Sequence, residues 1–391
     1  MVSISEAYHQ IIKNSVSLSS QFVDLNKATS YYLSEDVISP IHMPPFRQSA
    51  MDGYALNLHE NEQYNLIGEI KAGDSRQIIL NPGDAVRIFT GAPVPDSANA
   101  VIMQEKVVVD ENRLKIESRI SPQENIRPIG EQVQLGKIAL PKGTLLTPAA
   151  IGFLSSLGIA RVNITRKPSI AIVSTGNELI APGELLERGK IYESNITMLY
   201  SALNSVNFHD IETFRVKDDY EATLELIDKL MNDYEMVIIT GGISVGDYDF
   251  VGKALKELKV KELFYKVKQK PGKPLYYGKK GKTTVFGLPG NPAAALSCFY
   301  IYVRTCLELI SGNKNHHLSE FKASSVNEFV KKGDRPQFLK AIFNGDTVEI
   351  LEGQSSAMLQ TFAIANALVF IPEEVQKINM GDVVEVIPLP V

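Results

Sequence analysis

The fold of the central part of the chain is indicated by one stretch, Ser169-Ile170-Ala171-Ile172-Val173-Ser174-Thr175-Gly176-Asn177-Glu178. Its apolar run, residues 169–173, has the length of a buried strand, and it ends in a turn that contains a glycine. Further strands are predicted at 211–216, 235–239, 263–267 and 283–288, alternating with helices at 195–205, 219–231, 250–258 and 291–310. Alternating elements of this length predict a doubly wound, mostly parallel α/β sheet.

The segments on either side of this α/β domain have different patterns. Ser3 and Glu6 have the spacing of a capping box, which predicts an N-terminal helix. Thr147-Pro148 has the features of a second helix start, with Gly158 after its last apolar residue. We expect these two helices to pack together. The predicted domains are a small split α/β linker domain (1–45 and 137–167), a β-rich domain (46–136), the α/β domain (168–314) and a C-terminal β-barrel-like domain (315–391).

The composition excludes several classes of protein. The chain has 391 residues with 45 acids and 40 bases, a formal net charge of −5, and 44% apolar residues, which excludes a disordered or fibrous chain. The two cysteines cannot form a disulfide framework or a four-cysteine zinc site. We find no secretion signal and no apolar stretch of membrane-spanning length, and the acidic balance argues against nonspecific nucleic-acid binding. We expect a cytoplasmic protein with neither a membrane nor a nucleic acid as partner.

The loops that follow the predicted strands are the first place to seek a ligand site. In an open α/β sheet, ligands bind beyond the carboxyl ends of the strands. The loops concerned contain Ser174–Glu178, Asp218-Asp219, Thr240–Asp249, Lys266–Pro274 and Leu288–Pro292. We expect all five loops to meet at one edge of the sheet.

The third of these loops is rich in glycine and suits an anion. Gly241, Gly242 and Gly246 would let backbone N–H groups approach a phosphate, and the helix that follows offers its positive dipole end. The pattern is neither G-x-G-x-x-G nor a P-loop, so ordinary dinucleotide or Walker-type binding is not indicated. The alternative is a tight turn between a strand and a helix.

Three lysines, Lys266, Lys268 and Lys270, are predicted to lie on one face of a strand. Their like charges repel one another unless an anion or solvent lies opposite. The alternative is a solvated face of an edge strand that prevents aggregation. The turn Lys270-Pro271-Gly272-Lys273-Pro274 favours the anion site, because two prolines stiffen a turn that carries lysines.

Carboxylates on the same edge suit a divalent cation. They are Glu178, Asp218, Asp247 and Asp249. Mg²⁺ binds one or two carboxylates together with substrate phosphate and water, so lysines and Mg²⁺ together favour phosphate or oxyanion transfer chemistry. The alternative is a helix cap, which fits Asp218 well and Glu178 poorly, because the helix after Glu178 starts later.

Two further stretches in the β-rich domain are candidates. Asp52-Gly53 lies in Pro44–Tyr54 and by default forms a turn, and Thr90 lies where a strand runs into Gly91 and two prolines. Elsewhere the six histidines show no paired metal spacing, and His316-His317 lies in a polar linker. Cys298 and Cys306 lie in an apolar helix, which indicates buried packing.

Six segments together resemble the signatures of the molybdopterin molybdotransferase family, which is similar also to the E domain of gephyrin. They are Ser49–Ala55, Thr90–Pro95, Ser174–Leu179, Thr240–Gly246, Lys270–Pro274 and Leu288–Pro292, in family order. The resemblance implies a molybdopterin-binding-like α/β domain in an elongated four-domain subunit that forms a homodimer. It also implies an enzyme that takes adenylylated molybdopterin and molybdate and releases AMP with Mg²⁺ present, with a molybdopterin adenylyltransferase and molybdoenzyme apoproteins as partners.

The resemblance also implies roles for particular residues. The positions that match functional positions of the family are Asp52, Thr90, Glu178, Asp218, Asp249, Lys266 and Lys270. Glu178 and Asp249 would hold Mg²⁺, and Lys266, Lys270 and Lys273 would attract molybdate and the adenylate phosphates. The remaining cofactor-binding candidates are Gly241, Gly242, Ser244, Gly246, Gly290 and Asn291, with Pro289 and Pro292 as shaping prolines. Asp52 and Thr90 are expected to act across the dimer.

The chain departs from the family pattern at two places. Gln132 stands where the family commonly has an acid, and Gln360-Thr361 replaces a Ser-Ser pair. Three alternatives stay open at this point. They are the adenylyltransferase step, a gephyrin-like scaffold without enzymatic activity, and a preference for tungstate over molybdate.

Overall fold

The computed structural model describes residues 1–243, 250–314 and 320–390. The chain forms two compact units. The first comprises Met1–Gln21, Ser30–Tyr32 and Thr165–Val391, and the second comprises Phe22–Thr29 and Leu33–Ile164. Because the predicted domain boundaries are finer than this division, they stay a prediction.

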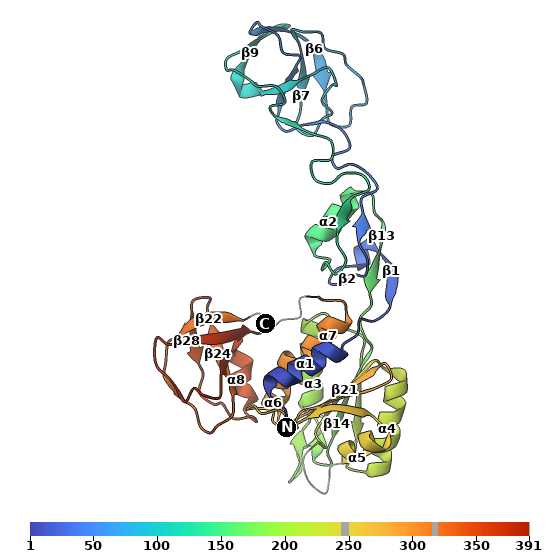
Figure 1. The fold of residues 1–391 in the computed structure, drawn as a ribbon, viewed down its shortest axis with the longest axis vertical. Helices are drawn as coiled ribbons and strands as arrows, with labels where there is room; N and C mark the ends of the chain where they lie inside the picture. Colours follow the sequence, from blue (N-terminus) through green and yellow to red (C-terminus); the bar gives the residue numbers. More distant parts are fainter. Residues whose placement is uncertain (244–249, 315–319, 391) are drawn as a thin grey trace. The chain divides into compact units, whose positions relative to one another are not determined.

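The first unit contains the predicted α/β sheet, in the strand order β17-β14-β18-β21-β20-β19. Figure 1 labels its strands β14 and β21. The first four strands are parallel, whereas β20 runs antiparallel to both of its neighbours. Their bounds are β14 Ile170–Thr175, β17 Ile211–Val216, β18 Met236–Thr240, β19 Lys261–Tyr265, β20 Tyr276–Lys280 and β21 Thr283–Leu288. The predicted mostly parallel α/β fold is confirmed, and β20 is a strand that the sequence pattern missed.

Helices cover both faces of this sheet, as its alternating side chains require. Ile170 and Ile172 of β14 pack with α3 (Asn195–Ser205) and with the continuous helix formed by α6 (Pro292–Cys298), η3 (Phe299–Val303) and α7 (Arg304–Ile310). Ala171 and Val173 face the other way and pack with α4 (Tyr220–Asp233) and α5 (Phe250–Glu257). Figure 1 shows these two helical layers on opposite sides of β14 and β21. The strands are therefore buried on both faces, which explains their continuous apolar sequence.

The N-terminal helix α1 (Ile4–Asn14) has the predicted capping box. The Ser3 N–H donates to Glu6 Oε2 at 2.7 Å, and the Glu6 N–H donates to Ser3 Oγ at 3.1 Å. Its buried side chains Ala7 and Ile11 belong to the core of the α/β domain, and the Tyr8 hydroxyl donates to Ile301 O at 2.9 Å. The apolar face of α1 is therefore covered by the α/β domain, and its predicted packing on the second helix stays a prediction.

Contrary to the expectation from the sequence, the helix Pro292–Ile310 is long and apolar enough, by length and composition alone, to cross a membrane. In this structure, 83% of the most apolar 18-residue stretch of the helix is buried inside the protein. Cys298 and Cys306 are both buried within it, as predicted. These features are typical of the central helix of a packed core.

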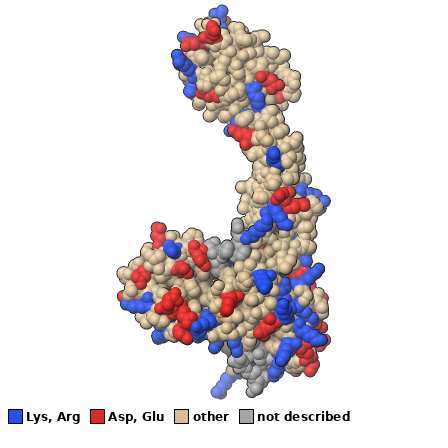
Figure 2. Space-filling view, viewed as in Figure 1, with Lys and Arg blue, Asp and Glu red and all other residues tan. Residues whose placement is uncertain are grey.

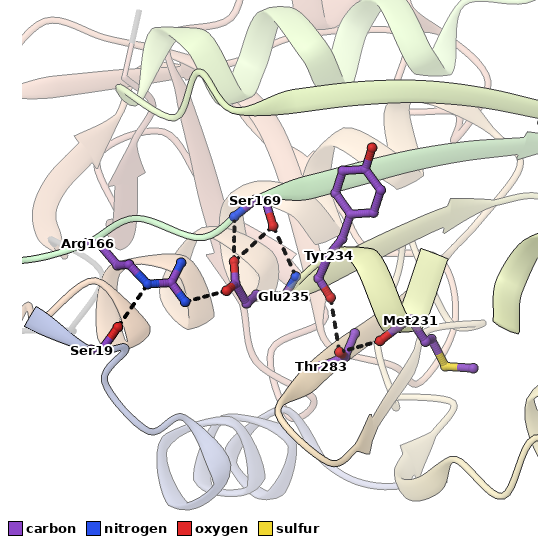
Figure 3. Close-up of polar contacts among 7 residues, drawn as sticks. All are labelled: Ser19, Arg166, Ser169, Met231, Tyr234, Glu235 and Thr283. Atoms are coloured by element: carbon purple, nitrogen blue, oxygen red, sulfur yellow. Dashed lines mark hydrogen bonds and ion pairs between the residues drawn. The ribbon is translucent and has the colours of Figure 1, made fainter. Parts of the chain in front are cut away.

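A polar network ties the start of β18 to the chain that enters the α/β domain (Figure 3). Glu235 pairs with Arg166 and accepts from the N–H and the hydroxyl of Ser169, both at 2.9 Å. Arg166 Nε also donates to Ser19 Oγ at 3.0 Å, and Thr283 Oγ1 donates to carbonyl groups of α4 and the residue after it. The hydrogen bond from Arg166, with help from Ser169, lowers the pKa of Glu235 to about 2.

This network predicts a pH-dependent contribution to stability. Because the folded pKa of Glu235 lies below its ordinary value of 4.5, its contribution is present above that value and is lost as the pH falls toward 2. We expect Glu235→Gln to lower the free energy of unfolding by about 1–3 kcal/mol at pH 7 and by less at pH 3, where part of the contribution has been lost. Denaturant titrations at the two pH values measure the difference in the free energy of unfolding between the wild type and the variant. If this difference is the same at both pH values, the assigned ion pair is contradicted.

The C-terminal part of the first unit is a closed β-barrel with the strand order β22-β25-β24-β26-β28. The bounds are β22 Phe321–Ser325, β24 Gln337–Phe343, β25 Thr347–Ile350, β26 Ala367–Ile371 and β28 Val383–Pro388, with α8 Leu359–Ile364 and the short pair β23 Phe329–Val330 and β27 Lys377–Ile378. The predicted barrel-like domain is confirmed. On the face that Figure 2 shows, acidic and basic side chains are interspersed over the barrel and the α/β domain.

The second unit contains a six-stranded sheet with the order β8-β5-β7-β6-β10-β9. The bounds are β5 Gly53–Leu56, β6 Gln63–Ile70, β7 Asp84–Ile88, β8 Ala100–Met103, β9 Val107–Asp110 and β10 Arg113–Ile116, and the predicted hairpin β9–β10 is confirmed. A side chain at Gly53 would place its Cβ 1.8 Å from Ile102 O, so only glycine fits between β5 and β8.

The second unit also contains the helix α2 (Pro148–Ser156), which Thr147 caps as predicted. Its short elements are β3 Val37–Ile38 paired with β12 Ile138–Leu140, β4 Gln48–Ser49 paired with β11 Ile126–Arg127, and the helical turns η1 Leu25–Lys27 and η2 Gln104–Lys106. A three-stranded sheet of the chain consists of β1 Ser20–Asp24, β13 Arg161–Thr165 and β2 Tyr32–Leu33. The pairing of β3 with β12 joins the two segments of the predicted split domain.

Candidate functional site at the carboxyl ends of the strands

A cavity of about 430 Å³ opens at the carboxyl ends of three parallel strands. Thr175 is the last residue of β14, Thr240 is the last residue of β18, and Pro289 follows β21. The lining residues are Thr175, Glu178, Leu179, Ile191, Asn195, Thr240, Gly241, Gly242, Ile243, Pro274, Pro289, Gly290 and Asn291. Six predicted site residues, Glu178, Gly241, Gly242, Pro289, Gly290 and Asn291, are thus brought together.

The glycine turn after β18 packs directly against the end of β14. Gly241 and Gly242 have positive φ angles of 82° and 63°. A Cβ at Gly241 would lie 2.9 Å from Thr175 O, and one at Gly242 would lie 2.7 Å from a methyl group of Val251. The Gly241 N–H was expected to face a phosphate, but it donates to Leu288 O at 3.3 Å. These two glycines therefore shape the cavity, and the Gly241 N–H is already used by the fold.

The carboxylate of Glu178 lies over the turn that follows β14. A Cβ at Gly176, where φ is +146°, would lie 2.5 Å from Glu178 Oε2, so the side chain occupies the space that glycine leaves open. Glu178 is exposed, and its carbonyl accepts from the Ile191 N–H at 2.9 Å. Since α3 starts only at Asn195, Glu178 is not a helix cap, as the sequence indicated.

Asp218 is held beside the Glu178 turn, and the alternative that it caps a helix is wrong. The cap of α4 is Asp219, whose Oδ1 accepts from the Ala222 N–H at 2.8 Å. Asp218 instead makes a reciprocal pair with Asn177. Asp218 Oδ2 accepts from the Asn177 N–H at 3.1 Å, and the Asp218 N–H donates to Asn177 Oδ1 at 3.2 Å. Asp218 does not line the cavity, but it joins two of the predicted loops.

The residues that close the cavity from the side of α3 were not predicted from the sequence. The short strands β15 (Leu179–Ile180) and β16 (Ile191–Tyr192) pair and bring Asn195 to the cavity, where its Nδ2 donates to Gly290 O at 2.9 Å. The buried Glu193, the residue before the N-cap Ser194, accepts from the Ile196 N–H in the first turn of α3 at 2.8 Å. The position of Glu193 just before the helix predicted at 195–205 is the sequence feature that could have identified it. Thr175 Oγ1 and Asn195 Oδ1 are buried without a hydrogen-bond partner among the described residues.

The prediction that Lys266, Lys268 and Lys270 share a strand face is wrong. Strand β19 ends at Tyr265, and Lys266 has a positive φ of 68°, which turns the chain out of the strand. Lys268 forms an ion pair with Glu373 at 2.6 Å, which raises its pKa. Lys266, Lys270 and Lys273 do not line the cavity, although Pro274, the neighbour of Lys273, does.

The Lys270–Pro274 turn is attached to the C-terminal barrel. The Lys270 N–H donates to Pro336 O and the Phe338 N–H donates to Lys270 O, both at 2.9 Å. Arg335 Nη1 donates to Gln269 O at 3.0 Å, a neighbour that the sequence alone did not identify. A second barrel loop reaches the cavity wall, since Asn291 Nδ2 donates to Ser356 Oγ at 3.0 Å. Asn291 and Pro292 begin α6 at the N-cap and first helical positions, as predicted.

Three predicted residues, Ser244, Gly246 and Asp249, lie outside the described residues, as do Asp247 and His316-His317. Of the proposed metal pair, only Glu178 is therefore placed. The part of the chain that the structure describes holds no group of three or more His, Cys, Asp or Glu side chains suited to a metal. One exposed carboxylate at a roomy cavity nevertheless fits Mg²⁺, which usually takes few protein ligands and completes its shell with phosphate and water.

Asp52 and Thr90 form a second constellation, within the second unit. Asp52 Oδ1 accepts from both the N–H and the hydroxyl of Thr90, each at 2.7 Å. These two hydrogen bonds lower the pKa of the exposed Asp52 carboxylate, and the one from the Thr90 N–H has the larger effect. Gln132 is exposed on the same unit. The predicted pair of site residues is thus brought together within the second unit.

Comparisons with known proteins cover almost the entire chain. Residues 2–158 match the MoeA N-terminal region (domain I and II), residues 171–308 match a probable molybdopterin binding domain, and residues 322–389 match the MoeA C-terminal region (domain IV). A molybdopterin molybdenumtransferase of Haemophilus influenzae is 33% identical over 94% of this chain and 93% of its own length. One of Staphylococcus epidermidis is 29% identical over 99% and 95%. The crystal structure of a molybdopterin biosynthesis MoeA protein from Pyrococcus horikoshii has a TM-score of 0.85 at 28% identity, covering 99% of this chain and 100% of that one.

Proposed function

Because the chain belongs to the MoeA family, we propose that its cavity is the place where molybdenum from molybdate is inserted into adenylylated molybdopterin, with Mg²⁺-dependent release of AMP. The protein is a molybdopterin molybdenumtransferase of molybdenum cofactor synthesis. One observation carries the assignment of the site. Glu178, the Gly241-Gly242 turn and the Gly290-Asn291 turn line one cavity at the carboxyl ends of β14, β18 and β21.

In the proposed reaction, Glu178 supplies the negative charge that holds Mg²⁺. Its carboxylate lies over Gly176 at the cavity, and the Asn177–Asp218 pair fixes the turn on which it stands. Bound Mg²⁺ would withdraw charge from the phosphate groups of the adenylate and so ease the departure of AMP. Asp249 is proposed as the second carboxylate, and Ser244 and Gly246 as further contacts to the substrate.

Lys270 and Lys273 are proposed to attract molybdate. Within the described residues neither lysine has an ion pair, whereas Lys268 is paired with Glu373. The two ammonium groups stand on either side of Pro271-Gly272, and this turn leads into Pro274 at the cavity wall. Ammonium groups in a fixed turn suit a doubly charged oxyanion that must be brought to a neighbouring substrate. Lys266 is proposed to assist them.

We further propose that the protein works as a cytoplasmic homodimer in which Asp52 and Thr90 of one subunit complete the cavity of the other. The support is chemical, since the Asp52–Thr90 constellation holds an exposed, ionised carboxylate in a separate unit of the chain. A molybdopterin adenylyltransferase would supply the substrate, and molybdoenzyme apoproteins would receive the product.

The choice of substrate tests the proposed function. Purified protein is incubated either with adenylylated molybdopterin and molybdate or with molybdopterin and ATP, both with Mg²⁺. We expect AMP in the first mixture and no adenylylated product in the second. Accumulation of adenylylated molybdopterin in the second mixture would assign the protein to the adenylyltransferase step instead. Replacing molybdate with tungstate in the first mixture measures the preference between the two oxyanions.

A further inference from the structure

Gln269 stands directly before the turn that carries Lys270 and Lys273, and it is fully buried. A buried amide must satisfy two N–H donors and one carbonyl acceptor. Its Nε2 donates to Pro271 O at 3.0 Å and to Gly272 O at 3.4 Å. Its Oε1 accepts from the hydroxyl of Tyr302. The amide nitrogen therefore holds the following turn, whereas the amide oxygen is bound to the core helix.

The partners of Gln269 are themselves fixed. Tyr302 is fully buried in η3, in the middle of the core helix. Gly272 has a φ of +83°, and a Cβ there would lie 2.4 Å from Cys298 Sγ, so the turn packs tightly on α6. The backbone carbonyl of Gln269 accepts from Arg335 of the barrel at 3.0 Å. Gln269 thus connects the lysine turn to the core helix and to the barrel at the same time.

We infer that Gln269 is a positioning residue for the oxyanion substrate. By holding the carbonyls of Pro271 and Gly272, it sets the path of the backbone between Lys270 and Lys273 and hence the spacing of their ammonium groups. This inference rests on the proposed function, because it takes those two lysines as the molybdate contacts. A purely stabilising Gln269 would affect unfolding alone, whereas a positioning one affects the concentration of molybdate that the enzyme requires.

The variant Gln269→Met tests the inference, because methionine has a similar length and no hydrogen-bonding amide. We expect the KM for molybdate in AMP release to rise about tenfold or more, with kcat at saturating molybdate changed by less than about threefold. Tyr302→Phe removes only the hydroxyl that donates to Gln269, and we expect it to raise the same KM about threefold. If Gln269→Met does not fold, the KM for molybdate of Tyr302→Phe alone tests the inference.

Asn327 offers a matched control in the barrel. Its Nδ2 donates to Ile350 O at 2.7 Å, and its Oδ1 accepts from the Ile350 N–H at 3.0 Å. We expect Asn327→Leu to lower the Tm while leaving the KM for molybdate unchanged. A folded Gln269→Met, or a Tyr302→Phe, with the wild-type KM would overturn the inference. Wild-type protein without molybdate-dependent AMP release would instead remove the proposed function, so the two failures are distinguishable.

Discussion

Glu178→Gln is expected to slow molybdate-dependent AMP release by about 10²–10³-fold, the loss typical of removing one group that stabilises developing charge. Glutamine has the same size and can occupy the space over Gly176, so the cavity keeps its shape. It lacks the negative charge that the proposed Mg²⁺ site requires. Initial rates at several Mg²⁺ concentrations measure the loss, which high Mg²⁺ should partly offset.

Glu187→Gln is the matched control for this variant. Glu187 is an exposed glutamate in the segment between β15 and β16 and does not line the cavity. We expect it to leave the rate and the Mg²⁺ dependence unchanged. A Glu178→Gln variant that releases AMP at the wild-type rate would remove Glu178 from the metal site.

Mixing two inactive variants is expected to restore activity. Asp52→Asn removes the charge that Thr90 holds, and Glu178→Gln removes the charge at the cavity. If each site of a homodimer combines Asp52 from one subunit with Glu178 from the other, a mixed dimer contains one intact site. After random exchange of subunits, about a quarter of the wild-type activity should return. The measurement is AMP release after the two variants have been unfolded and refolded together.

Each variant refolded alone provides the control and should stay at its own low rate. If Asp52 and Glu178 act within one subunit, every site in the mixture carries one defect. The mixture would then show no recovery, and the proposal that Asp52 and Thr90 act across the dimer would fail.

The parts of the fold that sequence predicts best are those decided by burial. Strands β14, β18 and β21 lie between two helical layers, so their residues are apolar on both faces, and the helix 195–205 ends where its pattern ends. Their order along the chain then places the loops after them at one edge of the sheet. For this reason the sequence alone is enough to group Glu178, Gly241 and Asn291 at one site.

The errors come from interactions that leave no periodic pattern. Strand β20 contains a glycine and two lysines, and it exists because it pairs with β19 and β21. The lysines after β19 leave the strand because Lys266 adopts a positive φ. Asn177 and Gln269 bond mainly to the backbone, and such partners are set by the fold as a whole rather than by local spacing.

The most direct measurement of the central claim couples the two products of the proposed reaction. Purified protein is given adenylylated molybdopterin, Mg²⁺ and increasing molybdate, and the AMP released is compared with the molybdenum bound to molybdopterin. The account predicts about one molybdenum atom per AMP, with little AMP when molybdate is left out. Release of AMP at the same rate without molybdate, or AMP without molybdenum in the product, would contradict it.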